Sequence, residues 1–358
     1  MQLDWLIVAG FLCGVIAGGA ARYGRLCSMS AIEDALVGQD YRGASAWLLA
    51  VSVAGLATLA LVTVGLADVG ASLYGSPRLH LLGVAGGGAI FGLGMTLAGT
   101  CSFGLIVRAG SGDLAAAVSA LVVGILAYAV TAGVLAPMRA ALLDIGVLDL
   151  SAIGGGTLDA IAAHWVGLPT ARAMVAIVLL LLAGLVVADR RMRQRPRLLA
   201  GAILLGLTVA AGWAVTTVGV RELSATRVES LSFVAPVGRA LLQTMALPFR
   251  GVGFGVASVI GVFVASMAVA AARRELRWEA FDDPTEMRRH LAGAALMGVG
   301  GVLAQGCTIG QGLSAASVLA LSAPLFVIAV LAGARIGLSY LIEGTALWRL
   351  GFSPRSER

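Results

Sequence analysis

The chain has 358 residues, of which 59% are hydrophobic and only 12% are charged, and its mean hydropathy is +0.95. A water-soluble domain of this size needs far more polar surface, so the composition predicts an all-α protein that crosses the lipid bilayer several times. The net charge of +6 comes from arginine alone, because the chain has no lysine. No basic amphipathic helix or recognition motif accompanies this excess, so no nucleic-acid partner is expected.

Nine apolar runs follow one another along the chain as predicted membrane segments. They span residues 5–21, 45–66, 83–98, 114–136, 171–188, 198–218, 250–272, 291–304 and 314–341. The first hydrophobic stretch, taken from Leu3 to Ala21, contains Asp4 and no basic stretch precedes it, which indicates a retained helix and not a cleaved signal peptide. The third and the eighth reach only ~21–24 Å at about 1.5 Å per residue, which is short of a hydrocarbon core of ~30 Å.

Both short segments end in a cluster of small and polar residues. The clusters are Gly99-Thr100-Cys101-Ser102 and Gln305-Gly306-Cys307-Thr308. A helix that breaks inside the bilayer leaves backbone groups unpaired, so each break must line a cavity with protein walls. Broken helices of this kind are typical of binding sites near the bilayer midplane in transporters.

The two clusters also belong to an internal repeat. A shift of 206 residues places 91–105 over 297–311 and matches Cys101 with Cys307, together with glycines on both sides. With four segments in each half and one connecting helix at 171–188, the two halves are predicted to have opposite orientations, as in inverted-repeat transporters. We therefore divide the chain into an amino-terminal half, a connector, a carboxy-terminal half and a tail, at 1–140, 141–197, 198–345 and 346–358.

The arginines predict the orientation in the membrane. If the amino terminus is outside, 17 arginines lie on the inner side and seven on the outer side, and Arg335 lies within the last helix. The positive-inside rule therefore predicts an external amino terminus and a cytoplasmic carboxyl terminus. Four outer arginines, Arg221, Arg227, Arg239 and Arg250, are interpreted either as interfacial anchors or as a basic vestibule for an anion. Residues 226–242 between them are expected to form a short helix that dips into the protein.

Three of the four cysteines have surroundings that favour a function. Cys13 lies within an apolar run and is interpreted as a small buried hydrophobe. Cys27, Cys101 and Cys307 have glycine, serine, threonine or arginine neighbours, which suits thiols exposed at backbone breaks. Four cysteines spread over about 300 residues do not form a disulfide framework. No Walker A motif or dinucleotide fingerprint is present, so no cofactor is expected.

Three uses of these thiols are compatible with the residues. The first is a soft-metal site, although the cysteines are unpaired in sequence and the three histidines lie at segment edges. The second is a membrane enzyme that forms a persulfide or a disulfide on the cysteines. The third is a transport path in which S–H groups hydrogen-bond a passing sulfur anion. Helices that resume near 111–113 and 312–314 are expected to direct their amino termini toward that anion.

Three motifs resemble the YeeE/YedE sulfur-transport family, and the similarity covers nearly the whole chain. The first is the arginine-containing context of Cys27, Tyr23-Gly24-Arg25-Leu26-Cys27-Ser28. The second is the frame FGxGxxLAGxCxxG from Phe91 to Gly104, which contains Cys101 and precedes Arg108. The third is GCxIGQGLSxxS from Gly306 to Ser317, which contains Cys307. Thr100, Ser111 and Thr308 depart from the common pattern, so the choice among thiosulfate and other sulfur or selenium anions stays open.

This resemblance implies an hourglass-shaped transporter, not an enzyme, in a bacterial inner membrane. It implies that thiosulfate passes Cys27, Cys101 and Cys307 in succession through S–H contacts, with no metal and no cofactor. It also implies a possible small cytosolic sulfurtransferase-like partner. The residues expected to support the path are Arg25, Gly99, Thr100, Ser102, Arg108, Gln305, Gly306, Thr308 and Gln311.

Overall fold

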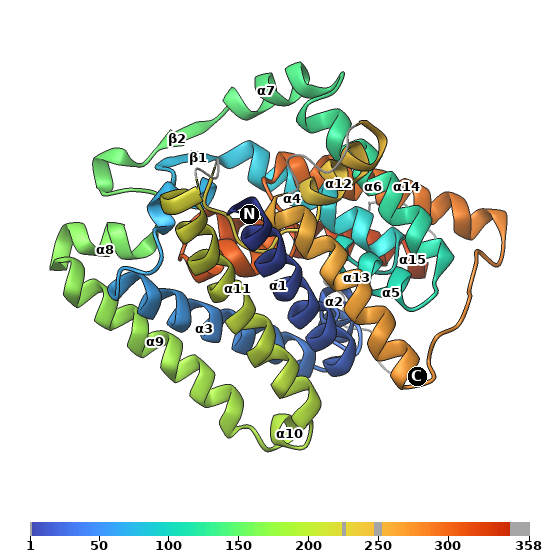
Figure 1. Cartoon of the computed structure of the whole chain (residues 1–358), viewed down its shortest axis with the longest axis horizontal. Helices are drawn as coiled ribbons and strands as arrows, with labels where there is room; N and C mark the ends of the chain where they lie inside the picture. Colours follow the sequence, from blue (N-terminus) through green and yellow to red (C-terminus); the bar gives the residue numbers. More distant parts are fainter. Residues whose placement is uncertain (1, 224–226, 247–252, 344–358) are drawn as a thin grey trace.

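The computed structural model describes residues 2–223, 227–246 and 253–343, and helices dominate all three ranges (Figure 1). Arg250 and the predicted tail at 346–358 lie outside them. The long helices are α1 (Gln2–Gly24), α3 (Arg42–Thr63), α4 (Leu81–Leu97), α6 (Leu114–Thr131), α9 (Leu168–Ala188), α11 (Pro196–Leu223), α13 (Phe254–Ala272), α14 (Pro284–Leu303) and α15 (Ser322–Glu343). The short ones are α2 (Ser28–Leu36), α5 (Ser102–Gly110), α7 (Ala136–Asp144), α8 (Leu158–Val166), α10 (Arg190–Arg193) and α12 (Ala235–Ala246).

The remaining regular structure is short and lies between the helices. Single turns form η1 (Val69–Ala71), η2 (Leu73–Gly75), η3 (Ser151–Ile153) and the π-helical η4 (Gly310–Ala315). Strands β1 (Arg78–His80) and β2 (Val147–Asp149) pair antiparallel, with Leu79 opposite Leu148.

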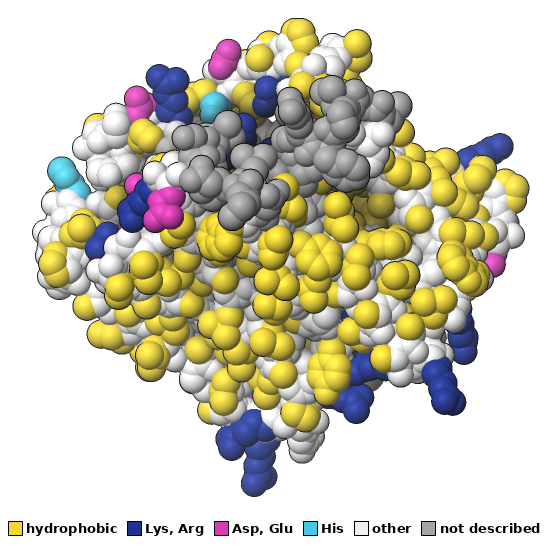
Figure 2. Space-filling model, viewed as in Figure 1, with side chains coloured by type: hydrophobic (Ala, Val, Ile, Leu, Met, Phe, Trp, Pro, Cys, Tyr) yellow, Lys and Arg dark blue, Asp and Glu magenta, His cyan; other side chains and the backbone are white. Residues whose placement is uncertain are grey.

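Eight helical stretches within the described residues are long and apolar enough to cross a membrane. Two of them join a long helix to the short helix that follows, over Trp5–Leu36 and Leu81–Gly110. The eighth predicted segment, 291–304, lies in α14 and is not among the eight stretches, because α14 starts with charged residues such as Arg288 and Arg289. Apolar side chains cover a broad band of the surface, and arginines gather at its edges (Figure 2). The prediction of an all-α polytopic membrane protein is confirmed.

The long helices pack in matching pairs. Helix α1 packs on α13 and α3 packs on α11, while α4 packs on α15 and α6 packs on α14. At the centre α1 meets α11, and α4 meets α14. When the two predicted halves are exchanged, the contact of α1 with α13 corresponds to that of α11 with α3. The contact of α4 with α15 likewise corresponds to that of α14 with α6. This pairing agrees with the predicted inverted repeat, although the twofold relation and the hourglass outline stay predictions.

Glycine allows these helices to approach closely. A Cβ added at Gly14 of α1 would lie 2.1 Å from the backbone oxygen of Ser258, and one at Gly333 of α15 would lie 2.0 Å from that of Ala89. No real side chain tolerates such distances, so the backbones meet directly, as small residues permit in membrane helix pairs. The abundance of glycine in the chain therefore has a structural cause.

Three predicted element boundaries are wrong in detail. The helix after Cys101 resumes at Ser102 and not near 111–113, because the Cys101 thiol itself caps α5. After Cys307 the chain forms η4 from Gly310 and begins α15 only at Ser322, so the predicted segment 314–341 is divided. The short helix expected over 226–242 begins at Ala235, and residues 227–234 precede it without helical structure.

Candidate functional site

The first break lies between α4 and α5. Gly99 has a φ of +67°, a left-handed conformation that glycine adopts without steric cost. The chain then reverses so that Cys101 becomes the amino-terminal cap of α5. Its thiol sulfur accepts a hydrogen bond of 3.4 Å from the backbone N–H of Gly104. The thiol is therefore fixed at the end of a helix in the protein interior, where the side chain of Cys101 is 1% exposed.

The second break, after α14, repeats this geometry. Gln305 occupies the position of Gly99 and has a φ of +61°, which is rare for a residue with a side chain. The sulfur of Cys307 accepts a hydrogen bond of 3.4 Å from the N–H of Gly310, and the residue is completely buried. The two cysteines related by the predicted shift of 206 residues thus have the same backbone environment.

Cys27 joins this pair from a third position. It caps α2 after a turn in which Arg25 has a φ of +52°. Its sulfur lies 3.8 Å from the hydroxyl oxygen of Thr100, which belongs to the first break. Cys27 is partly exposed, whereas Cys101 and Cys307 are buried. The structure therefore brings one accessible thiol next to the first of two enclosed breaks.

Ser28 connects both breaks to this segment. Its hydroxyl donates to the hydroxyl of Thr308 over 3.4 Å and lies 3.8 Å from the sulfur of Met95. Both hydroxyls also lie near the thiol of Cys101. Sequence reasoning missed Ser28 and Met95 as site residues. Their signals were Ser28 directly after Cys27, and Met95 within the frame that ends in Cys101.

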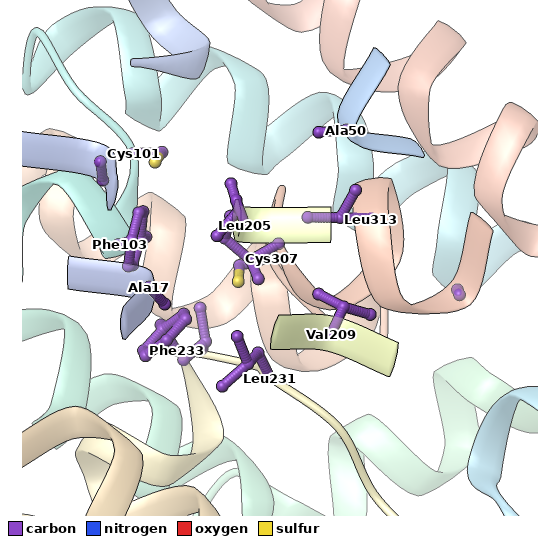
Figure 3. Close-up of a cluster of buried hydrophobic side chains, with 14 of the residues drawn as sticks. Ala17, Ala50, Cys101, Phe103, Leu205, Val209, Leu231, Phe233, Cys307 and Leu313 are labelled. Carbon is purple, nitrogen blue, oxygen red and sulfur yellow. The ribbon is translucent and has the colours of Figure 1, made fainter. Parts of the chain in front are cut away.

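Two aromatic rings fill the space close to the thiols. Phe103 and Phe233 are buried, and their ring centroids are 4.7 Å apart. Figure 3 shows them in the same cluster as Cys101 and Cys307. Phe233 is also the residue that the repeat places opposite Cys27. Apolar packing therefore surrounds the buried thiols in this conformation.

Cys27 faces two adjoining cavities on one side of the protein. The larger, of about 640 Å³, also contacts Asp40, Arg42 and Arg197. The other, of about 540 Å³, contacts Thr100 and has five arginines in its wall, Arg22, Arg25, Arg108, Arg274 and Arg277. We call this side the arginine face. Its positive charge suits an anion near the accessible thiol.

The opposite side of the second break is nearly closed. A cavity of about 20 Å³ lies there among Tyr74, Gln305, Ser322 and other residues. The Tyr74 hydroxyl donates to the backbone carbonyl of Gln305 over 3.2 Å, and its ring meets Trp213 edge to face at 6.3 Å. Burial raises the pKa of Tyr74, so its hydroxyl stays protonated and donates at neutral pH. Tyr74 and Gln305 of the second break therefore line this small cavity together.

The other predicted supporting residues have several local roles. Ser102 is buried next to Cys101, and its hydroxyl has no hydrogen-bond partner within the described part of the chain. Arg108 pairs with Asp113 at 2.7 Å and extends into the arginine-lined cavity. Gln311 donates to the carbonyl of Ala304 and accepts from Ser322, so it braces the second break. A Cβ at Gly306 would lie 3.0 Å from the Tyr74 hydroxyl.

The described residues contain no cluster of potential metal ligands and no disulfide. No group of three or more histidines, cysteines or acidic residues in these ranges is placed to hold a metal ion. All four cysteines of the chain are free thiols, and Cys13 is buried within α1. The available chemistry is that of neutral hydrogen-bonding thiols beside hydroxyls and guanidinium groups.

Comparisons with known proteins identify the family of the chain. The family described as "Sulphur transport" matches residues 23–336. The thiosulfate transporter TsuA of Escherichia coli (strain K12) is 27% identical over 329 residues, which cover 86% of this chain and 87% of that protein. The thiosulfate transporter TsuA of Spirochaeta thermophila is 27% identical over 324 residues, which cover 88% of this chain and 93% of that protein. The chain therefore belongs to the sulphur transport family, whose function is transport and not catalysis.

Proposed function

We propose that this protein takes up thiosulfate, or a closely related sulfur anion, across the bacterial inner membrane. The observation that carries the proposal is the convergence of three thiols and their hydroxyl neighbours at two helix breaks. Cys27 contacts Thr100, and Ser28 contacts Thr308, the residue after Cys307. The names of the two relatives, which align over most of their length, agree with this substrate.

The paired thiols and hydroxyls suit both ends of such an anion. Thiosulfate carries a soft terminal sulfur at one end and three oxygens at the other. Thiols are weak donors with a polarizable sulfur, whereas hydroxyls are better donors to oxygen. A substrate that passes Cys307, Cys101 and Cys27 would exchange one set of weak contacts for the next, which favours passage over trapping. No covalent bond forms or breaks in this scheme.

The direction of the path follows from the charges. The closed side at Tyr74 is proposed as external, and the arginine face is proposed as cytoplasmic, in agreement with the positive-inside rule. The amino terminus is then outside. Alternating access would require the two proposed halves, 1–140 and 198–345, to move relative to each other about the connector at 141–197. The matched geometry at Cys101 and Cys307 supports this division.

Uptake of radiolabelled thiosulfate tests the proposal. Cells that lack their own sulfate and thiosulfate importers would express the wild type, Cys307→Ala or Cys13→Ala at equal membrane levels. Wild type and Cys13→Ala should accumulate label, because Cys13 lies within the continuous helix α1 and at neither break, and Cys307→Ala should not. Absence of uptake by the wild type would contradict the substrate. Full uptake by Cys307→Ala would contradict the thiol relay, and labelled sulfur retained on a cysteine would show a covalent mechanism instead.

A cytosolic sulfurtransferase-like partner is a separate proposal. The arginine face offers a basic surface around the accessible Cys27, where an acceptor protein would meet the emerging anion. Uptake that rises when such a protein is expressed with the wild type supports this partner. Uptake that is unchanged by it contradicts a requirement for the partner while leaving transport intact.

A further inference from the structure

One carboxylate bridges two arginines at the mouth of the arginine-lined cavity. Glu275 accepts a hydrogen bond of 2.9 Å from Arg22 at the end of α1. Its second oxygen lies 3.7 Å from the guanidinium of Arg25. The side chain of Arg22 is 25% exposed and that of Arg25 is 83% exposed. Each arginine is therefore only partly engaged by the same anionic group.

The cavity beside this bridge has an excess of positive charge. Among the described residues that line it, five are arginines and one, Glu275, is acidic. Arg108 is already paired with Asp113, so its charge is partly compensated. Arg22 and Arg25 share the carboxylate of Glu275, and Arg274 and Arg277 add two further positive charges to the wall. With about 540 Å³ the cavity has room for a small oxyanion and its water, since each water occupies roughly 30 Å³.

Arg22 also has an unused donor. Its Nε is buried and has no hydrogen-bond partner among the described residues, while its Nη2 contacts Glu275. A guanidinium presents parallel N–H groups that match two oxygens of one anion. The contact of Glu275 with Nη2 alone leaves the second N–H group of this pair unused. Arg22 is thus poised to exchange Glu275 for a ligand that uses more of its donors.

We propose that Arg22 and Arg25 form an oxyanion-binding site beside Cys27, and that Glu275 occupies it as an internal competitor. The ligand is a divalent tetrahedral thio-oxyanion, which binds with its oxygens at the arginines and its sulfur at Cys27. This ligand rests on the proposed function. The carboxylate of Glu275 repels the dianion and occupies the arginine N–H groups that the dianion would use. Binding of the dianion therefore displaces Glu275 from both arginines. The competitor keeps the site from holding the anion too tightly to release it.

Site-specific alkylation of Cys27 tests the site directly. Cys27 is partly exposed and the other three cysteines are buried, so an alkylating agent should modify it first. The full-length wild type in lipid nanodiscs would be treated with iodoacetamide at increasing thiosulfate or sulfate, and mass spectrometry would quantify modified Cys27. Because thiosulfate displaces iodide from iodoacetamide, glutathione alkylated in the same sample would correct for the reagent that thiosulfate consumes. Glu275→Gln should lower the thiosulfate concentration for half-protection by about fivefold, as expected for loss of one partly exposed charge. Arg22→Gln should raise it on the order of tenfold.

Matched variants separate the site from general electrostatics. Arg193 belongs to α10, which precedes the cavity residues Arg195 and Arg197; its guanidinium donates to the carbonyl of Ala188, and it is not among the described residues that line either cavity. Arg193→Gln also removes one positive charge, and it should leave the thiosulfate concentration for half-protection unchanged. Arg25→Gln provides a second test at an exposed residue if Arg22→Gln does not fold.

The outcomes distinguish this site from the proposed function. If the thiosulfate concentration for half-protection is unchanged or higher in Glu275→Gln, Glu275 is not a competitor, even where the wild type takes up thiosulfate. Equal effects of Arg193→Gln and Arg22→Gln overturn the site. Protection by sulfate that depends on Arg22 and Glu275, without any thiosulfate uptake, supports the anion site and contradicts the proposed substrate.

Discussion

The hydroxyl of Ser28 donates to the hydroxyl of Thr308 over 3.4 Å, which joins the segment after α1 to the break after α14. These residues are 280 positions apart in the chain. The contact places a hydroxyl of the Cys27 segment beside Thr308, the residue that follows Cys307.

Ser28→Ala should therefore slow uptake without unfolding the protein. Loss of one hydroxyl donor to an anion corresponds to about a tenfold lower uptake rate. Ser28→Thr retains the hydroxyl and should recover part of the rate. Radiolabelled uptake at equal membrane levels measures both. Equal rates for wild type and Ser28→Ala would remove Ser28 from the path.

Gly104→Ala should disrupt the first break. A Cβ at this position would lie 2.1 Å from the hydroxyl oxygen of Thr100, so Thr100 would be forced away from Cys27. We expect uptake to fall at least tenfold. Gly86 of α4 has nothing within 4 Å of its added Cβ, so Gly86→Ala is the matched control and should retain uptake. Loss of uptake in both variants would mean that alanine is harmful irrespective of the site.

Tyr74→Phe should loosen the closed side of the path. The change removes the hydrogen bond to the carbonyl of Gln305 while the ring contact with Trp213 persists. Because Gln305 has a left-handed backbone that neighbours must support, its loop should open more often. Alkylation of Cys307 by a membrane-impermeant reagent, added from the amino-terminal side, should accelerate several-fold. An unchanged rate would show that Tyr74 does not control access.

Acid should weaken one local interaction on the arginine face. The hydrogen bonds and the charge of Arg42 lower the pKa of Asp40 from 3.8 to about 2. A depressed carboxyl pKa stabilises the fold above pH 3.8, and that contribution is lost as the pH falls toward 2. The difference in thermal stability between wild type and Asp40→Asn should be constant from pH 7 to about 5 and should shrink below pH 4. A difference that grows in acid would contradict this sign.

Much of the fold could be predicted because lipid leaves few alternatives. Backbone groups in a bilayer must be paired within the chain, so apolar runs of sufficient length must be helices. The short runs that end at Cys101 and Cys307 identified the breaks for the same reason. Local sequence was less informative about where the helices resume. A thiol that accepts the N–H of Gly104 acts as a helix cap, although cysteine is not a usual capping residue.

The sequence by itself determined the helical membrane architecture, the two cysteine breaks and their internal repeat, because these depend on local hydropathy and spacing. Only the tertiary structure decided which side chains meet. Ser28 reaches Thr308, Cys27 reaches Thr100, and Glu275 bridges Arg22 and Arg25 through packing of elements far apart in the chain. Such contacts depend on the register of packed helices, which a one-dimensional pattern of apolar and polar residues does not specify.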